Sequence, residues 1–168
     1  MNKTKTFVFL GIAILALGCA GPKIKEALTA LTPKVDELEM KVTEARAVLD
    51  IVKGFEVKVA DPKFAKDKDG ITKLATEIEN TKTAIGTVLT LEGEVTPIAD
   101  SLAVLDKKAK GEDKTAIAGL NEKIAAIRAG FGEFQAANAA LDGLKVKLDE
   151  MKAPAKKVAV KAPVAKKK

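Results

Sequence analysis

Histidine, tryptophan and tyrosine are absent from the 168-residue sequence, and cysteine occurs only once. The lack of histidine excludes histidine acid–base catalysis, zinc sites built on imidazole, and nucleophile arrangements of the Ser-His-Asp or Cys-His kind. A single cysteine cannot form a disulfide within the chain. These absences favour a protein that is not an enzyme, and we expect neither a metal nor a cofactor.

A run of apolar residues long enough to span a bilayer is also missing from the amino terminus. The apolar run there covers 11 residues, 7–17, whereas a spanning helix needs about 20. Lys3 and Lys5 precede the run and Gly18 follows it, which is the order of basic, apolar and small residues found in secretory signals. We expect residues 1–18 to be a cleaved signal peptide and not a permanent membrane span.

The only cysteine, Cys19, stands where this signal would be cleaved. The block Leu15-Ala16-Leu17-Gly18-Cys19 resembles the lipobox of bacterial lipoproteins, although Ala16 stands where the commonest lipobox has leucine. The resemblance implies that Cys19 carries palmitate-like acyl chains and becomes the new amino terminus, with residues 19–22 as a lipidated tether. Two or three acyl chains on one residue hold a protein on a membrane effectively permanently. The other interpretation is an ordinary signal peptide followed by a chance or buried cysteine.

The net charge of +6 is concentrated at the carboxyl terminus. Residues 19–151 carry 20 basic and 23 acidic side chains, a net charge of −3, whereas residues 152–168 contain no acidic residue. The seven lysines of this segment are Lys152, Lys156, Lys157, Lys161, Lys166, Lys167 and Lys168. A segment with two prolines and a repeated Lys-Ala-Pro pattern cannot bury an apolar core. We therefore expect residues 152–168 to form a disordered tail.

A flexible basic tail suits an anionic polymer or surface, such as peptidoglycan or membrane phosphate. Nucleic acid is not expected as a partner, because an exported lipoprotein rarely meets it. The alternative is a tail that only keeps the protein in solution and has no partner of its own.

Between residues 23 and 151, apolar residues recur at alternating steps of three and four, which is the spacing of one helical face. Four such stripes cover residues 24–52, 71–88, 98–109 and 117–148. They predict an all-α fold, an elongated antiparallel bundle of about four heptad-patterned helices. Heptads also permit a coiled coil between chains, so a homo-oligomer is an alternative to a bundle within one chain. Asn138 would then set the register, or else it is a partly exposed polar residue of the bundle.

Proline and polar residues mark the expected helix starts. Thr32-Pro33 and Thr96-Pro97 each fit an N-cap followed by proline at the first helical position, with a kink as the alternative at Pro33. Residues 54–70 are expected to connect two helices. Asp69 is expected to N-cap the second of them and not to bind calcium, because Ala65 and Thr76 would occupy the first and twelfth positions of a calcium loop.

Signal, helical body and basic tail together predict a lipid-anchored, non-enzymatic lipoprotein of the bacterial cell envelope, which spaces or tethers the membrane to an anionic partner. This plan resembles that of the murein lipoprotein, although the chain is far longer and lacks that family's Tyr-Arg-Lys ending. The lipoprotein resemblance, with Ala20 after the cysteine, implies the outer membrane facing the periplasm. Two alternatives stay open: a helical module that binds an acyl chain or a protein helix, and a surface-exposed lipoprotein that contacts host molecules.

Overall fold

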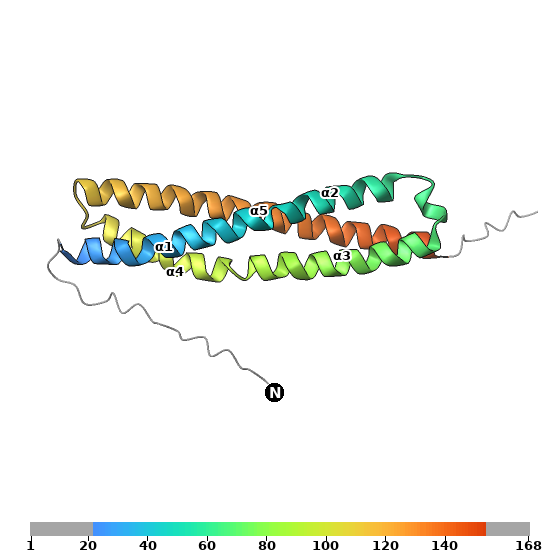
Figure 1. Cartoon of the computed structure of the whole chain (residues 1–168), viewed down its shortest axis with the longest axis horizontal. Coiled ribbons are helices and arrows are strands. Elements are labelled where there is room, and N and C mark those ends of the chain that lie inside the picture. Colours follow the sequence, from blue (N-terminus) through green and yellow to red (C-terminus); the bar gives the residue numbers. More distant parts are fainter. Residues whose placement is uncertain (1–21, 154–168) are drawn as a thin grey trace, which may run out of the picture. The chain divides into compact units, whose positions relative to one another are not determined.

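The structure is a computed structural model that describes residues 22–153, and this range is all-α, without a strand (Figure 1). The prediction of an all-α fold is therefore confirmed. In chain order, the helices of these residues are α1 (Pro22–Ala45), α2 (Ala47–Ala60), the short 3-10 helix η1 (Phe64–Lys66), α3 (Lys68–Leu89), α4 (Glu92–Asp106) and α5 (Glu112–Lys152).

The described chain divides into two compact units, and α5 contributes to both. Unit 1 contains residues 22–46 and 87–133, which form α1, α4 and the first half of α5. Unit 2 contains residues 47–86 and 134–153, which form α2, η1, most of α3 and the second half of α5. Each unit thus brings together helical segments from two separate parts of the sequence.

Unit 1 buries one apolar face of each of its helices, and α1 packs against α4. Its core residues are Ile24, Leu28, Leu31, Val35, Leu38, Val42, Val95, Ile98, Leu102, Leu105, Ala109, Ile117, Leu120, Ile124, Ile127 and Phe131. Between α1 and α5 the packing is close at Gly130, where an added Cβ would lie 2.6 Å from Cγ1 of Val42. Glycine at this position lets the two helices approach each other.

Unit 2 has a similar apolar core with more aromatic content. Its buried residues are Val52, Phe55, Val59, Phe64, Ile71, Leu74, Ile78, Ile85, Phe134, Leu141, Leu144 and Leu148. Phe64 of η1 is part of this core, and the Lys58 ammonium lies 5.6 Å from the centre of its ring. That distance is within the range of a cation–π contact.

The predictions that helices begin at Thr32-Pro33 and at Thr96-Pro97 are wrong. Pro33 lies inside α1 and Pro97 lies inside α4, so neither residue begins a helix. A proline inside a helix removes one backbone hydrogen bond. Both prolines are exposed, so water can reach the carbonyl groups that lose their partners. The breaks fall elsewhere, at Arg46 between α1 and α2 and at residues 90–91 between α3 and α4.

The expected N-cap of α3 is also corrected. Helix α3 begins at Lys68, and the carboxylate that caps it belongs to Asp67, not Asp69. The Gly70 N–H donates a hydrogen bond of 2.9 Å to Oδ1 of Asp67, and the Ile71 N–H donates one of 2.9 Å to the Asp67 carbonyl. A Cβ at Gly70 would lie 2.2 Å from Oδ2 of Asp67, so this cap requires glycine three residues after the aspartate.

The connection between the first two stripes is shorter than expected. Helix α2 continues through Gly54 to Ala60, so only residues 61–67, including η1, join it to α3. In α5 a seven-residue step from Asn138 falls on Lys145, but Lys145 is exposed and Leu144 is buried instead. Asn138 is partly exposed, as the second of the two interpretations expects.

Candidate functional site

Of the candidate lipidation and anion-binding residues, the structure describes one. Cys19 and the lysines Lys156, Lys157, Lys161, Lys166, Lys167 and Lys168 lie outside the described range, and only Lys152 lies within it. Lys152 is exposed in the last turn of α5, and its Nζ lies 3.7 Å from Oδ1 of Asp149. Helix α1 begins at Pro22, so two residues separate it from Cys19 in the sequence.

The interior of both units is apolar. Among the residues that the structure describes, no polar or charged side chain is buried. Residues 22–153 also contain no group of three or more acidic or cysteine side chains placed to hold a metal ion. None of the helices in this range is both long and apolar enough to cross a bilayer. Polar chemistry in the described chain is therefore confined to the surface.

In unit 1, surface ion pairs join α1 to α5. The Lys123 ammonium lies 2.6 Å from a carboxylate oxygen of Asp36 and 3.0 Å from one of Glu39. Hydrogen bonds to these two carboxylates raise the pKa of Lys123 above its ordinary value. A further pair joins Arg46 to Glu133 at 3.2 Å.

These pairs define the direction of the two helices. The partners of Asp36 and of Arg46 are each 87 residues further along the chain. A constant offset means that α1 and the first half of α5 run parallel. Figure 1 shows the same direction for both helices.

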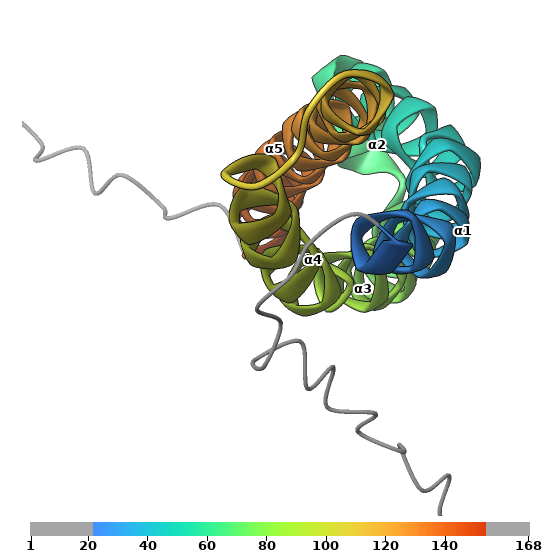
Figure 2. The same cartoon turned by 90° about the vertical axis from the view of Figure 1, so that its left-hand side faces the viewer.

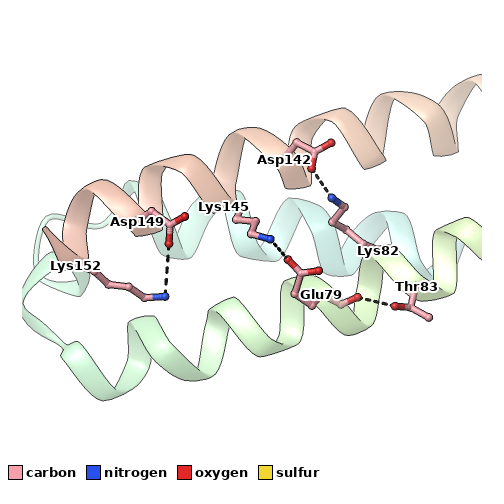
Figure 3. A network of polar contacts seen from close by, with 7 residues as sticks. All are labelled: Glu79, Lys82, Thr83, Asp142, Lys145, Asp149 and Lys152. Atoms are coloured by element: carbon pink, nitrogen blue, oxygen red, sulfur yellow. Dashed lines mark hydrogen bonds and ion pairs between the residues drawn. The ribbon is translucent and has the colours of Figure 1, made fainter.

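In unit 2, a second set of pairs joins α3 to α5 (Figure 3). The Lys145 ammonium lies 2.5 Å from Oε1 of Glu79, and Lys82 pairs with Asp142. The hydrogen bond from Lys145 lowers the pKa of Glu79, and the same bond raises the pKa of Lys145. Three residues further along α3, the partner lies three residues earlier in α5, so these two segments run antiparallel.

The ion pairs lie on the surface and account for the register of the helices. Exposed pairs contribute little to stability when taken singly. Their value lies in selecting one axial alignment of helices whose apolar faces alone permit several. The sequence argument missed them, although the signal is present: charged residues flank the apolar stripe at Lys123, Glu133, Asp142 and Lys145.

Unit 2 also contains a groove between α2 and the last turns of α5, with a volume of about 370 Å³. Its lining residues are Glu56, Val59, Ala60, Ala140, Gly143, Leu144, Lys147 and Met151. Val59 and Leu144 are buried and supply apolar surface, whereas Glu56 and Lys147 are exposed. A Cβ at Gly143 would meet nothing within 4 Å, so the groove is open there.

The groove is near the lower end of the size range of small-molecule sites. Apolar walls with one acid and one base fit a short apolar side chain or part of an acyl chain. The sequence argument missed the groove because its small residues, Ala60, Ala140 and Gly143, lie beside the stripes and not in them.

Comparisons with protein-family models, with curated proteins and with solved structures gave no match.

Proposed function

We propose that this protein is a lipid-anchored, non-enzymatic lipoprotein of the bacterial cell envelope that tethers or spaces the membrane relative to an anionic partner. The observation that carries the proposal is the block of residues 15–19 with its cysteine, followed directly by a helical body. Because α1 begins at Pro22, a lipid on Cys19 would be joined to that body by a very short segment. Such an anchor fixes the body close to the lipid surface.

The body supplies the spacing in this proposal. We take each of its two units to be a helical bundle, with α1 in unit 1 following the anchor in the sequence and the end of α5 in unit 2 preceding the tail. Helix α5 alone contains 41 residues, which corresponds to about 60 Å at about 1.5 Å per residue. The apolar interiors and the ion pairs between helices support a structural role, since they hold shape and offer no reactive group.

The basic tail supplies the second attachment. Lys152 is exposed at the end of α5, and six further lysines follow it without an acidic residue. Seven positive charges on one arm attract an anionic polymer through long-range electrostatics, and salt weakens that attraction. Peptidoglycan is the partner we propose, with the outer membrane facing the periplasm as the site of the lipid anchor.

Two variants test the attachments separately. Cys19→Ala is expected to move the protein from the detergent phase to the aqueous phase and to abolish acylation, and unchanged partition would contradict lipid anchoring. Replacing the six lysines of residues 154–168 by glutamine is expected to abolish salt-sensitive cosedimentation with purified peptidoglycan sacculi. Replacing the same lysines by arginine is the matched control, because it keeps the charge and is expected to keep the binding.

The groove in unit 2 favours a second candidate function, the binding of an acyl chain or a short apolar peptide segment. Filling it by Gly143→Leu is expected to abolish binding of a fluorescent fatty acid. Gly119→Leu is the control, because Gly119 lies in the same helix with nothing within 4 Å of an added Cβ. If neither variant changes the fluorescence, the groove is not the binding site.

A further inference from the structure

The end of unit 1 that follows the anchor carries an accumulation of lysines. They lie at the start of α1, along the connection from α4 to α5 and in the first turn of α5: Lys23, Lys25, Lys107, Lys108, Lys110 and Lys114. All six are exposed. We call this set the basic end. Figure 2 looks toward the end of unit 1 where the start of α1 and the α4–α5 connection lie.

The helix register brings these separate segments to one level. The parallel alignment of α1 with α5 has an offset of 87 residues, which places Lys25 level with Glu112, the first residue of α5. Helix α4 packs against α1 and runs in the opposite direction (Figure 1), so Lys107, which follows its last residue, lies at this same end. Residues about 90 positions apart in the sequence therefore form one surface.

The α4–α5 connection is fixed against the unit. The Ala109 side chain is buried, and its N–H donates a hydrogen bond of 2.9 Å to the Leu105 carbonyl. Gly111 supplies the turn with a φ of 55°, a conformation that favours glycine. The lysines at positions 107, 108 and 110 are thus presented on an ordered turn.

The charge of this end differs from that of the rest of the described chain. Residues 22–26 and 106–114 contain six lysines and four carboxylates, Glu26, Asp106, Glu112 and Asp113, a net charge of +2. The other described residues contain 15 basic and 19 acidic side chains, a net charge of −4. Glu112 and Asp113 lie in the first turn of α5, where they complement the helix dipole.

Five of the six lysines of the basic end are also available. Within residues 22–153, no ion pair engages Lys23, Lys25, Lys107, Lys110 or Lys114. In the middle of unit 1, by contrast, Lys41, Arg46 and Lys123 all pair with carboxylates. The unit pairs several of its other cations and leaves these charges free for a partner.

We propose that the basic end is a contact surface for the anionic phospholipid headgroups of the membrane that holds the anchor. This inference rests on the proposed function, because it takes Cys19 as the lipidated residue. Three residues of chain, from Cys19 to Pro22, reach at most about 11 Å, which is close to the Debye length of about 8 Å at physiological salt. The acyl chains and the basic end then act as two membrane signals that orient unit 1 with this end toward the lipid.

Vesicle binding by the lipid-free protein tests the contact. The chain of residues 19–168 with Cys19→Ala keeps every described residue and lacks the acyl chains. It is expected to cosediment with vesicles of 30% phosphatidylglycerol in phosphatidylcholine at 0.1 M salt, and not with pure phosphatidylcholine. Each lysine near an anionic surface raises the membrane affinity by a factor of roughly five. We therefore expect binding to weaken at least about tenfold in the variant that combines Lys23→Gln, Lys25→Gln, Lys107→Gln and Lys110→Gln.

The control removes the same charge from unit 2. Lys63→Gln, Lys66→Gln, Lys68→Gln and Lys73→Gln affect four exposed lysines that no described ion pair engages, and this variant keeps the tail. Its affinity for the vesicles is expected to lie within about twofold to threefold of that of the parent, since the loss should be smaller than the contribution of a single lysine at the membrane surface. Equal weakening in both variants, or equal binding to neutral vesicles, would overturn the proposal.

Hydrogen exchange on the parent chain provides a readout that needs no substitution. Phosphatidylglycerol vesicles are expected to slow amide exchange in residues 23–26 and 106–114, and protection confined to other residues would overturn the assignment. Because these assays use protein without lipid, their failure would leave lipid anchoring intact. Failure of acylation at Cys19 in cells would instead remove the proposed function while the vesicle result could still stand.

Discussion

Val42 of α1 lies so close to Gly130 of α5 that a Cβ at position 130 would come within 2.6 Å of the valine Cγ1. Valine is stiff about its first side-chain torsion, so it cannot easily turn away. The contact lies between the two parallel helices of unit 1, near the Arg46–Glu133 pair. It makes Gly130 a packing residue, whereas other glycines of α5 have open space around them.

Gly130→Ala is expected to lower the free energy of unfolding by about 1 kcal/mol. Overpacking costs about 1–3 kcal/mol, and alanine returns up to about 1 kcal/mol of helix propensity. Gly132→Ala is the control in the same helix, where an added Cβ meets nothing within 4 Å, and it should stabilise the protein. Urea unfolding measures both. In a Val42→Ala background the Gly130→Ala penalty should vanish, and an unchanged penalty would contradict the contact.

The cap of α3 predicts unequal effects for two neighbouring aspartates. Asp67→Ala removes the acceptor of the 2.9 Å bond from the Gly70 N–H and is expected to cost about 0.5–2 kcal/mol. Asp69→Ala should cost less, because that carboxylate only complements the helix dipole. Gly70→Ala should resemble Asp67→Ala, since the new Cβ displaces the capping oxygen. Thermal unfolding that ranks Asp69→Ala as the more damaging change would refute the assignment.

The Glu79–Lys145 pair predicts a pH dependence in acid. Because the hydrogen bond from Lys145 lowers the pKa of Glu79 below 4.5 in the folded protein, the folded state holds this proton more weakly than the unfolded state. The stabilisation is complete above pH 4.5 and is lost as the pH falls through the lowered pKa. Glu79→Gln should therefore flatten the decline in stability below pH 4.5.

The control for this pair is Glu77→Gln, since Glu77 is exposed and forms no ion pair among the described residues. Glu77→Gln should not change the part of the decline in stability below pH 4.5 that Glu79 causes. An NMR titration of Glu79 offers a direct check, because its pKa should rise in Lys145→Gln. A Glu79 pKa that does not respond to loss of Lys145 would show that the pair does not form in solution.

Much of the helical core could be predicted from apolar spacing alone. Several residues at stripe positions are at most 1% exposed, for example Leu31, Val35, Leu74 and Ile127. Burial of an apolar face dominates the free energy of helix packing, so this signal is strong in the sequence. The stripe fails late in α5, where Leu144 replaces Lys145 in the core, because a helix of 3.6 residues per turn drifts from a strict seven-residue repeat.

Helix ends and the candidate surfaces were less predictable. Pro33 and Pro97 resemble helix starts locally, but packing of the continuous apolar face outweighs the loss of one backbone hydrogen bond at each proline. The groove and the basic end depend on which helices become neighbours. The start of α1 and the start of α5 share one end of unit 1 only because the two helices run parallel, a tertiary relationship that local spacing does not encode.

The central claim is that one chain joins a membrane to an anionic polymer, and a bridging assay tests it most directly. Acylated protein is reconstituted into neutral phosphatidylcholine vesicles loaded with a dye, and the vesicles are then mixed with purified peptidoglycan sacculi and centrifuged at low speed. The account predicts that the dye sediments with the sacculi at low salt, and that Cys19→Ala, deletion of residues 154–168 or high salt abolishes this. Dye that stays in the supernatant with the intact acylated protein would contradict the account.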